Sequence, residues 1–318
     1  MPFAVYWMGD PAAATDIREI ARRGFNLSRV AEALNTSQPG VSRQVQLLEA
    51  ELGVTLLVRR RNRILRLSPA GQEILTAAER LLTEAENIGS IARESNRQGG
   101  QLTIATSHLH ARYTLLEPIE AFVAKHPEIG LHMMQADPDE ILRLVESGEA
   151  DLGVSTETRT SRPPLTLVGG RPLGRSLIMP RDHPLARVPR PSLADIARFP
   201  IIGYTARSRG GQIITRTFED GGVGFSPVGS AIDADVVKAY VARGLGVGII
   251  PAIAFDPARD DLHIVDVTRL FPKSAITISL RQGTHVPRHM LDFIRSLAPK
   301  WSPPRPSPSS PRARRPDA

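Results

Sequence analysis

Two short helical patterns separated by a break, between residues 26 and 53, constrain the fold of this chain most. Asn26 suits the start of a helix that carries Val30, Ala31 and Leu34. A polar stretch over 35–38 interrupts it. After this stretch, apolar residues recur at intervals of four, three and four along one face of a second helix. This helix has a proline in its first turn and a glycine at its end. Two helices joined by a turn of about four residues predict a helix-turn-helix.

The outward side of the second helix carries side chains that can read DNA. Arginine and glutamine can bond base edges, serine can reach a base or a phosphate, and a helix N-terminus favours a phosphate. Val54–Val58 and Ile64–Leu67 then predict a hairpin with an arginine-rich turn. Its arginines are either phosphate contacts or solvated turn charges, and the neighbouring helices favour the first. The candidate DNA contacts are Thr36, Gln38, Pro39, Ser42, Arg43, Gln46, Arg59, Arg60, Arg61 and Arg63.

The charge of the chain is concentrated at its two ends. The net charge is +7, and residues 1–66 hold 10 arginines against 6 acidic residues. A basic N-terminal module is in keeping with a nucleic-acid partner. The basic segment 301–318 is rich in proline and serine with almost no apolar residues, which predicts disorder.

A long helix is predicted after the hairpin, over 68–98. Ser68 and Pro69 suit its start. Apolar residues then follow a 3.5-residue repeat through Ile74, Ala78, Leu81, Ala85, Ile88 and Ala92. About 30 helical residues span roughly 45 Å. The apolar seam packs either on its own domain or on a second copy, and its length beside a DNA-reading module favours dimerisation.

From residue 101 onward, short apolar runs alternate with helical stripes, which predicts an α/β architecture. Such sheets bind ligands at the carboxyl ends of their strands. Ser107, Thr156 and Thr205 each follow or end a predicted strand. Hydroxyl groups beside backbone N–H groups suit a small anionic or polar ligand. The alternative is that these hydroxyls only cap the helices that follow.

The residues exclude several other classes of protein. The chain has no cysteine, so it has no disulfides or thiolate sites. The histidines at 108, 110 and 132 lack partners at metal-ligand spacing, and the glycines at 244–248 follow a helix, the wrong order for a dinucleotide loop. We find no catalytic motif and expect no enzyme activity and no cofactor. No apolar run could span a membrane and residues 1–10 do not form a signal peptide, so we expect a cytoplasmic protein.

The N-terminal segment resembles the winged helix-turn-helix of LysR-type transcriptional regulators. The stretch 11–18 departs from that family's aromatic-containing first helix, which leaves two interpretations: a poorly packed first helix or a different translation start. The body is similar to the CysB branch of the family. The resemblance covers about nine-tenths of the chain and rests on Thr36–Gln44, Leu48–Gly53, Ser68–Gly71, Ile104–His108, Ala111–Tyr113, Leu131–Met133, Asp182–Ala186, Asp233–Lys238 and Gly244–Ile250.

The resemblance implies a domain organisation and a function. It implies a DNA-binding domain at 1–67, the helix at 68–98 and an effector domain at 101–300 that is similar to periplasmic binding proteins. Subdomain I is expected at about 101–168 and 270–300, and subdomain II at about 169–269. The branch regulates sulfur-assimilation and sulfur-source genes in response to an anion such as sulfate or an acetylated serine. It implies a dimer of dimers on promoter DNA, with RNA polymerase as a candidate partner. A solute-binding protein or enzyme on the same fold is the alternative.

The resemblance also implies an effector site with departures from the family. Ser107, Thr156 and Thr205 match its hydroxyl positions. Leu109 and His110 replace a threonine and a glutamine, and Leu173 replaces a tryptophan. Two added arginines, Arg207 and Arg209, are expected to close over the ligand, and His110 to titrate near neutrality. These departures predict an altered ligand that is still anionic.

Overall fold

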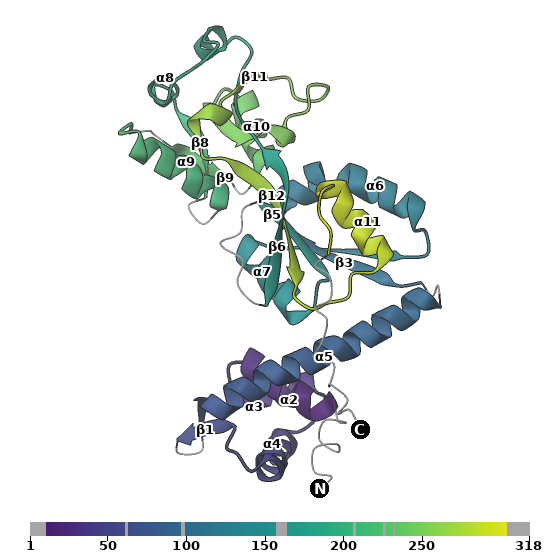
Figure 1. The fold of residues 1–318 in the computed structure, drawn as a ribbon. Coiled ribbons are helices and arrows are strands. Elements are labelled where there is room, and N and C mark those ends of the chain that lie inside the picture. Colours follow the sequence, from purple (N-terminus) through teal and green to yellow (C-terminus); the bar gives the residue numbers. More distant parts are fainter. Residues whose placement is uncertain are drawn as a thin grey trace, which may run out of the picture. The chain divides into compact units, whose positions relative to one another are not determined.

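The structure, a computed structural model, describes residues 11–60, 63–96, 99–156, 164–205, 208–224, 227–231 and 233–303. Contacts divide the chain into two compact units (Figure 1). The first is Met1–Gln98 with Gly283–His285, and the second is Gly99–Gln282 with Val286–Ala318. None of the described helices is both long and apolar enough to cross a membrane.

The first unit contains the predicted helix-turn-helix and hairpin. The helices of the motif begin and end as the sequence predicts: Asn26 Oδ1 accepts from the backbone N–H of Ser28, Ser37 Oγ accepts from that of Gly40, and Gly53 ends the second helix with φ 66°. The elements are α2 (Pro11–Arg22), α3 (Leu27–Ala33), α4 (Gln38–Leu52), β1 (Leu57–Arg60), β2 (Arg63–Leu67) and α5 (Pro69–Ser95).

The interpretation that the first helix is poorly packed is wrong. Ala14, Ile17 and Ile20 of α2 are 4%, 2% and 0% exposed and lie in the core of the unit. Helical spacing places these three residues on one face, which is enough to bury it without an aromatic residue inside the helix. Phe25, which follows α2, packs against the same core.

The hairpin begins three residues later than predicted, at Leu57, because the carboxylate of Glu49 captures the backbone before it. Glu49 Oε1 accepts from the N–H groups of Leu56 at 2.7 Å and Leu57 at 3.0 Å. The two strands pair from Leu57 with Leu67 to Arg60 with Arg63. A side chain of α4 therefore determines where the β1–β2 hairpin, called the wing below, begins.

The apolar seam of α5 has two different surroundings. Of the seam residues, Ala78 is buried in the core of the first unit, and Ile74 and Leu81 pack partly against it; Leu82, next to the seam, is buried as well. Farther along the helix, Ile88 is 69% exposed. The first half of the seam thus follows the own-domain interpretation, and the second half remains available to a partner.

The second unit contains two five-stranded sheets, as expected for an α/β body with two subdomains (Figure 1). The first sheet has the order β4-β3-β5-β12-β6. One face packs against α6 and α11, and the other against α7. The bounds are β3 (Gln101–Thr106), α6 (Leu116–Lys125), β4 (Gly130–Gln135), α7 (Pro138–Ser147), β5 (Leu152–Thr156), β6 (Leu165–Leu173), β12 (Ser274–Arg281) and α11 (Arg288–Leu297).

The second sheet has the order β11-β7-β10-β8-β9. Helices α8 and α9 pack on one face and α10 on the other. The chain enters this sheet through Gly174, between β6 and β7. The bounds are β7 (Arg175–Met179), α8 (Leu193–Ala197), β8 (Ile201–Tyr204), α9 (Arg209–Asp220), β9 (Pro227–Ala231), α10 (Ala234–Ala242), β10 (Val247–Pro251) and β11 (His263–Asp266).

The exposed half of α5 generates a prediction about assembly. Ile88→Asp should dissociate the oligomer without unfolding the chain, because a charge buried unpaired in an interface costs several kcal/mol, whereas this side chain is exposed within its own chain. Sedimentation velocity measures the effect. Glu79→Lys, nine residues earlier and on the opposite face of the helix, is the control that stays assembled. If Ile88→Asp sediments as the wild type does, the oligomer contacts lie elsewhere.

Candidate functional site

Helix α4 presents its predicted DNA-reading residues to solvent. Val41, Val45 and Leu48 are buried, which turns the opposite side outward. Arg43 and Gln46 are exposed, and Ser42 is half-buried. At the start of the helix Thr36, Gln38 and Pro39 are exposed as well. The capped N-terminus and these side chains form one polar surface, as major-groove reading requires.

The wing arginines are described in part. Arg59 and Arg60 are exposed at the end of β1. Arg59 Nη2 lies 3.7 Å from Glu49 Oε2, so Arg59 forms an ion pair with a residue of α4. Arg63 is placed by its backbone at the start of β2, and Arg61 lies outside the described residues. Arg60 is therefore the clearer candidate for a phosphate contact.

The effector candidates His110 and Thr156 meet at the ends of two adjacent strands. Strands β3 and β5 are parallel neighbours, so their carboxyl ends lie at the same sheet edge. His110 begins a short π-helix, η1 (His110–Thr114). Its Nε2 hydrogen-bonds Thr156 Oγ1 and its Nδ1 hydrogen-bonds Thr114 Oγ1, both at 2.8 Å. The imidazole thus joins the two strand ends.

The expectation that His110 titrates near neutrality is wrong. The side chain is fully buried, and this burial lowers its pKa to about 4. Burial penalises the charged imidazolium, and both neighbours are uncharged hydroxyls that do not offset the penalty. His110 is therefore neutral at physiological pH, with one donor and one acceptor nitrogen.

The hydroxyls of Ser107 and Thr205 do not cap the following helices. The helical turn after β3 starts at His108, and among the described residues no hydrogen bond joins the Ser107 hydroxyl to it. Helix α9 is capped by Ser208 Oγ, which accepts from the N–H of Gly211. Ser107 and Thr205 are both half-buried, directly after β3 and β8. Of the two added arginines, Arg209 is placed by its backbone at the start of α9. Arg207 lies outside the described residues.

The segment 107–114 of the first sheet meets the second sheet beside Tyr204. Leu109 and Tyr113 pack against the apolar cluster under α10, and so does Tyr204, the last residue of β8. Thr205 is the next residue in the chain. The structure therefore brings the strand ends of both sheets to one boundary, although Ser107, Thr156 and Thr205 come from three different strands.

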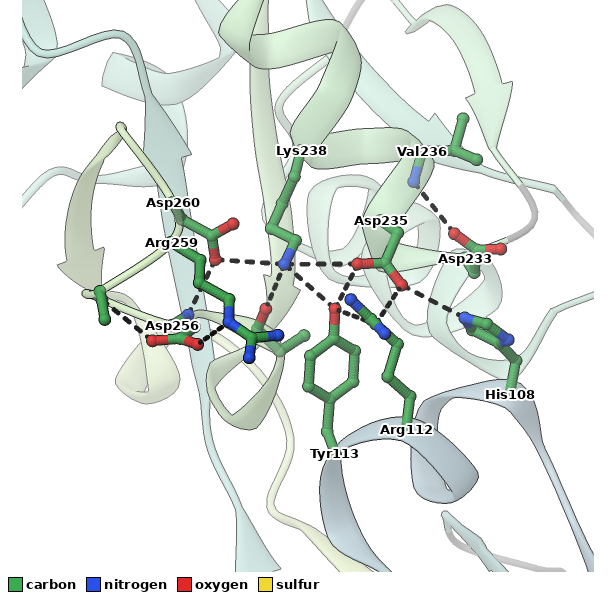
Figure 2. A network of polar contacts seen from close by, with 12 residues as sticks. His108, Arg112, Tyr113, Asp233, Asp235, Val236, Lys238, Asp256, Arg259 and Asp260 are labelled. Atoms are coloured by element: carbon green, nitrogen blue, oxygen red, sulfur yellow. Dashed lines mark hydrogen bonds and ion pairs between the residues drawn. The ribbon is translucent and has the colours of Figure 1, made fainter. Parts of the chain in front are cut away.

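A polar network at the start of α10 is a feature that the sequence analysis missed (Figure 2). The Asp235 carboxylate lies 3.0 Å from Arg112 Nε and 3.2 Å from His108 Nε2, and it accepts from the Tyr113 hydroxyl. The Lys238 ammonium donates to Tyr113 Oη at 3.0 Å and lies 3.1 Å from the Asp260 carboxylate. The spacing of Asp235 and Lys238, three apart on one helix, was the only sequence signal.

The network keeps its acid and base charged. Burial raises the pKa of Asp235, but hydrogen bonds from Tyr113 and His108, with the charges of Lys238 and Arg112, outweigh it and bring the pKa to about 2. Burial lowers the pKa of Lys238, but hydrogen bonds to Tyr113 and Asp260 outweigh it and raise the pKa. The segment 107–114 is therefore bonded to α10 by the ion pair between Arg112 and Asp235 and by hydrogen bonds.

Neither a metal site nor a second effector site follows from this network. Within the part of the chain that the structure describes, His108, Asp233 and Asp235 have the spacing of metal ligands, but Asp235 already faces Arg112 and Lys238. An open cavity of about 1150 Å³ lies beside the network. Ser107, Thr156 and Thr205 do not line it.

A winged helix-turn-helix, a long helix and a two-sheet α/β body with polar strand ends define a DNA-binding regulator with a ligand-binding domain. Residues 16–72 match the model described as "Bacterial regulatory helix-turn-helix protein, lysR family", and residues 95–302 match "LysR substrate binding domain". The chain belongs to the LysR family of transcriptional regulators.

Relatives agree with the CysB-like branch. The transcriptional regulator SsuR of Burkholderia cenocepacia is 37% identical over 89% of this chain and 92% of its own. CysB of Haemophilus influenzae is 36% identical over 89% and 88%. Cbl of Escherichia coli is 39% identical over 84% and 85%. The family and branch inferred from the sequence are thus confirmed, and these relatives are regulators rather than enzymes.

Solved structures agree on the fold. The cofactor-binding domain of the Cbl regulator is 34% identical, with a TM-score of 0.60 over 64% of this chain and 90% of its own. A full-length OxyR variant of Pseudomonas aeruginosa is 21% identical, with a TM-score of 0.65 over 91% and 97%. The second likeness shows the fold alone.

The exposed residues of α4 and the wing generate a prediction about DNA binding. Arg60→Ala should weaken binding to operator and random duplexes alike and lower the slope of log K against log salt by about 1, because it removes one phosphate contact. Arg43→Ala should cost about 1–3 kcal/mol on the operator only, because it removes a base contact. Fluorescence anisotropy at several salt concentrations separates the two. Equal losses for Arg43→Ala on both duplexes would reassign it to phosphate.

The buried His110 generates a prediction about pH. The unfolded chain binds a proton at this residue below about pH 6.5, and the folded chain binds it only below about pH 4. The free energy of unfolding therefore decreases as the pH is lowered from about 6.5 to about 4. The loss from this one group is at most about 3 kcal/mol.

Urea unfolding at pH 7, 5.5 and 4.5 measures this loss. His110→Gln cannot titrate and can still bond both threonines, so it should show a shallower decline than the wild type. Equal declines in the two proteins would contradict the burial of a neutral imidazole.

Proposed function

We propose that this chain binds promoter DNA through α4 and the wing and regulates sulfur-assimilation or sulfur-source genes in response to a small sulfur-related anion. The observation that carries the proposal is its likeness, at 36–39% identity over most of the chain, to SsuR, CysB and Cbl. The polar strand ends of the second unit supply the place where such a ligand would bind.

The chemistry of these strand ends suits an oxyanion bound without a full counter-charge. Ser107, Thr156 and Thr205 offer hydroxyl donors, and His110 is neutral, so it adds hydrogen bonding but no charge. Thr156 is already held by His110, which fixes the direction in which its hydroxyl can act. A tetrahedral oxyanion fits several neutral donors and backbone N–H groups.

Two departures from the family pattern favour an altered ligand. Leu109, where the family has a threonine, packs against the cluster under α10 and offers no donor. Leu173, where the family has a tryptophan, is 5% exposed at the end of β6. We infer an anion whose contacts fall on fewer hydroxyls than in the relatives.

The proposal includes partners and location. The exposed half of α5 supports dimers, and the family resemblance supports a dimer of dimers in the cytoplasm, with RNA polymerase as a candidate partner. The alternative, a solute-binding protein or enzyme, is not favoured, because the DNA-reading surface of the first unit has no role in it.

An electrophoretic gel shift on the chain's own upstream DNA tests the function. A shifted band whose mobility or affinity changes with sulfate or N-acetyl-L-serine is expected. The absence of any shift on that DNA or on the upstream regions of sulfur genes would contradict the proposal.

Ser107→Ala tests the effector site. Because this hydroxyl does not cap a helix, the variant should melt near the wild type without ligand. It should lose the ligand-induced rise in melting temperature, which at 100 times Kd corresponds to about 2.7 kcal/mol. Thr156→Ser keeps the hydroxyl that His110 needs and is the control that retains the rise. If Ser107→Ala keeps the full rise with both ligands, the site is misplaced.

A further inference from the structure

Two tyrosines stand where the segment 107–114 meets the second sheet, and their hydroxyls are in opposite situations. The hydroxyl of Tyr113 is fully used: it donates to Asp235 and accepts from Lys238 Nζ at 3.0 Å and from Arg112 Nε at 3.3 Å (Figure 2). The hydroxyl of Tyr204 is buried and has no hydrogen-bond partner among the described residues.

Among the described residues, the side chain of Tyr204 makes packing contacts and no hydrogen bond. Its ring contacts the apolar clusters on both faces of the second sheet. Leu109, from the segment 107–114, packs against one of these clusters. A buried hydroxyl without a partner has lost its hydration without compensation, so such a group in a native fold calls for a missing partner.

The surroundings of Tyr204 indicate what that partner is. Burial raises the pKa of Tyr204, so the hydroxyl stays protonated and can donate. The buried cation Arg175 begins β7, which runs antiparallel to β10, and β10 runs parallel to β8. Arg175, the first residue of β7, therefore lies at the same end of the strands as Tyr204, the last residue of β8. Two acids are near Tyr204: Asp233, whose carboxylate accepts from the N–H of Val236, and Asp235, which faces Arg112 and Lys238. A protonated hydroxyl that feels the charge of a cation at the same strand ends suits an anionic acceptor.

We propose that the Tyr204 hydroxyl donates a hydrogen bond to an oxygen of the anionic effector. This inference rests on the proposed function and deepens it. Ser107 and Thr156 bind the anion from the first sheet, and Tyr204 and Thr205 bind it from the second. Tyr204 is then a specificity-determining residue, because it accepts only a ligand that brings an oxygen acceptor to this buried position.

The experiment compares Tyr204→Phe with Tyr113→Phe in the full chain, in buffer free of sulfate and phosphate. Thermal melting without anion comes first. Tyr204→Phe removes a hydroxyl that has no partner among the described residues, so it should melt at or above the wild type. Tyr113→Phe takes a partner from Asp235 and Lys238, so it should melt lower. Calorimetric titration with inorganic sulfate and with N-acetyl-L-serine follows, and Tyr204→Phe should weaken the Kd by about tenfold or more.

The outcomes separate this inference from the proposed function. If the wild type binds the anions and Tyr204→Phe binds them equally well, the proposed function stands and the role of Tyr204 is overturned. If Tyr204→Phe melts as low as Tyr113→Phe, its hydroxyl has a structural partner such as a bound water, and the inference is overturned. If the wild type binds neither anion, both the proposed ligand class and the role of Tyr204 fall.

Discussion

The effector domain depends on how the eight residues from Ser107 to Thr114 are held from two sides. On one side the buried imidazole of His110 joins this segment to Thr156, at the end of the neighbouring strand of the first sheet. On the other side Arg112 and Tyr113 contact Asp235 of α10, the helix that packs on the second sheet. The first of these contacts lies away from bulk water, where a hydrogen bond is stronger than at the surface. This segment therefore links the strand ends of the first sheet to α10, in addition to the chain connections between β6 and β7 and between β11 and β12.

The helix-turn-helix and most of the interior strands could be predicted from the sequence, because local periodicity and capping residues determine them. Clear apolar runs mark the interior strands, whereas β6, β9 and β11 have weak ones, and all three lie at sheet edges. An edge strand pairs on one side only and tolerates proline and glycine, so its apolar pattern is weak. The segments of β6 and β9 contain both residue types, and β11 has only four residues.

The hydroxyl residues of the candidate effector site could be predicted from the sequence, but the protonation of His110 and the contacts of the charged residues could not. Serine and threonine at strand ends are visible in the sequence, and the structure places Ser107, Thr156 and Thr205 there. The burial of His110 and the bond between Tyr113 and Asp235, 122 residues apart, are products of tertiary packing. No local pattern carries them, and the same packing decides that the Tyr204 hydroxyl has no partner among the described residues.

The carboxylate of Glu49 sets the position of the wing relative to α4 in the DNA-binding unit. One oxygen accepts from the backbone before the wing, and the other faces Arg59 within it, so α4 and the hairpin are bonded through a single side chain. These contacts position the recognition helix and the wing relative to each other. On the proposed DNA-binding mode, the protein would then set the distance between the groove that α4 enters and the backbone that the wing reaches. An operator would match that distance by its own bending, so that DNA flexibility would become part of what the regulator selects.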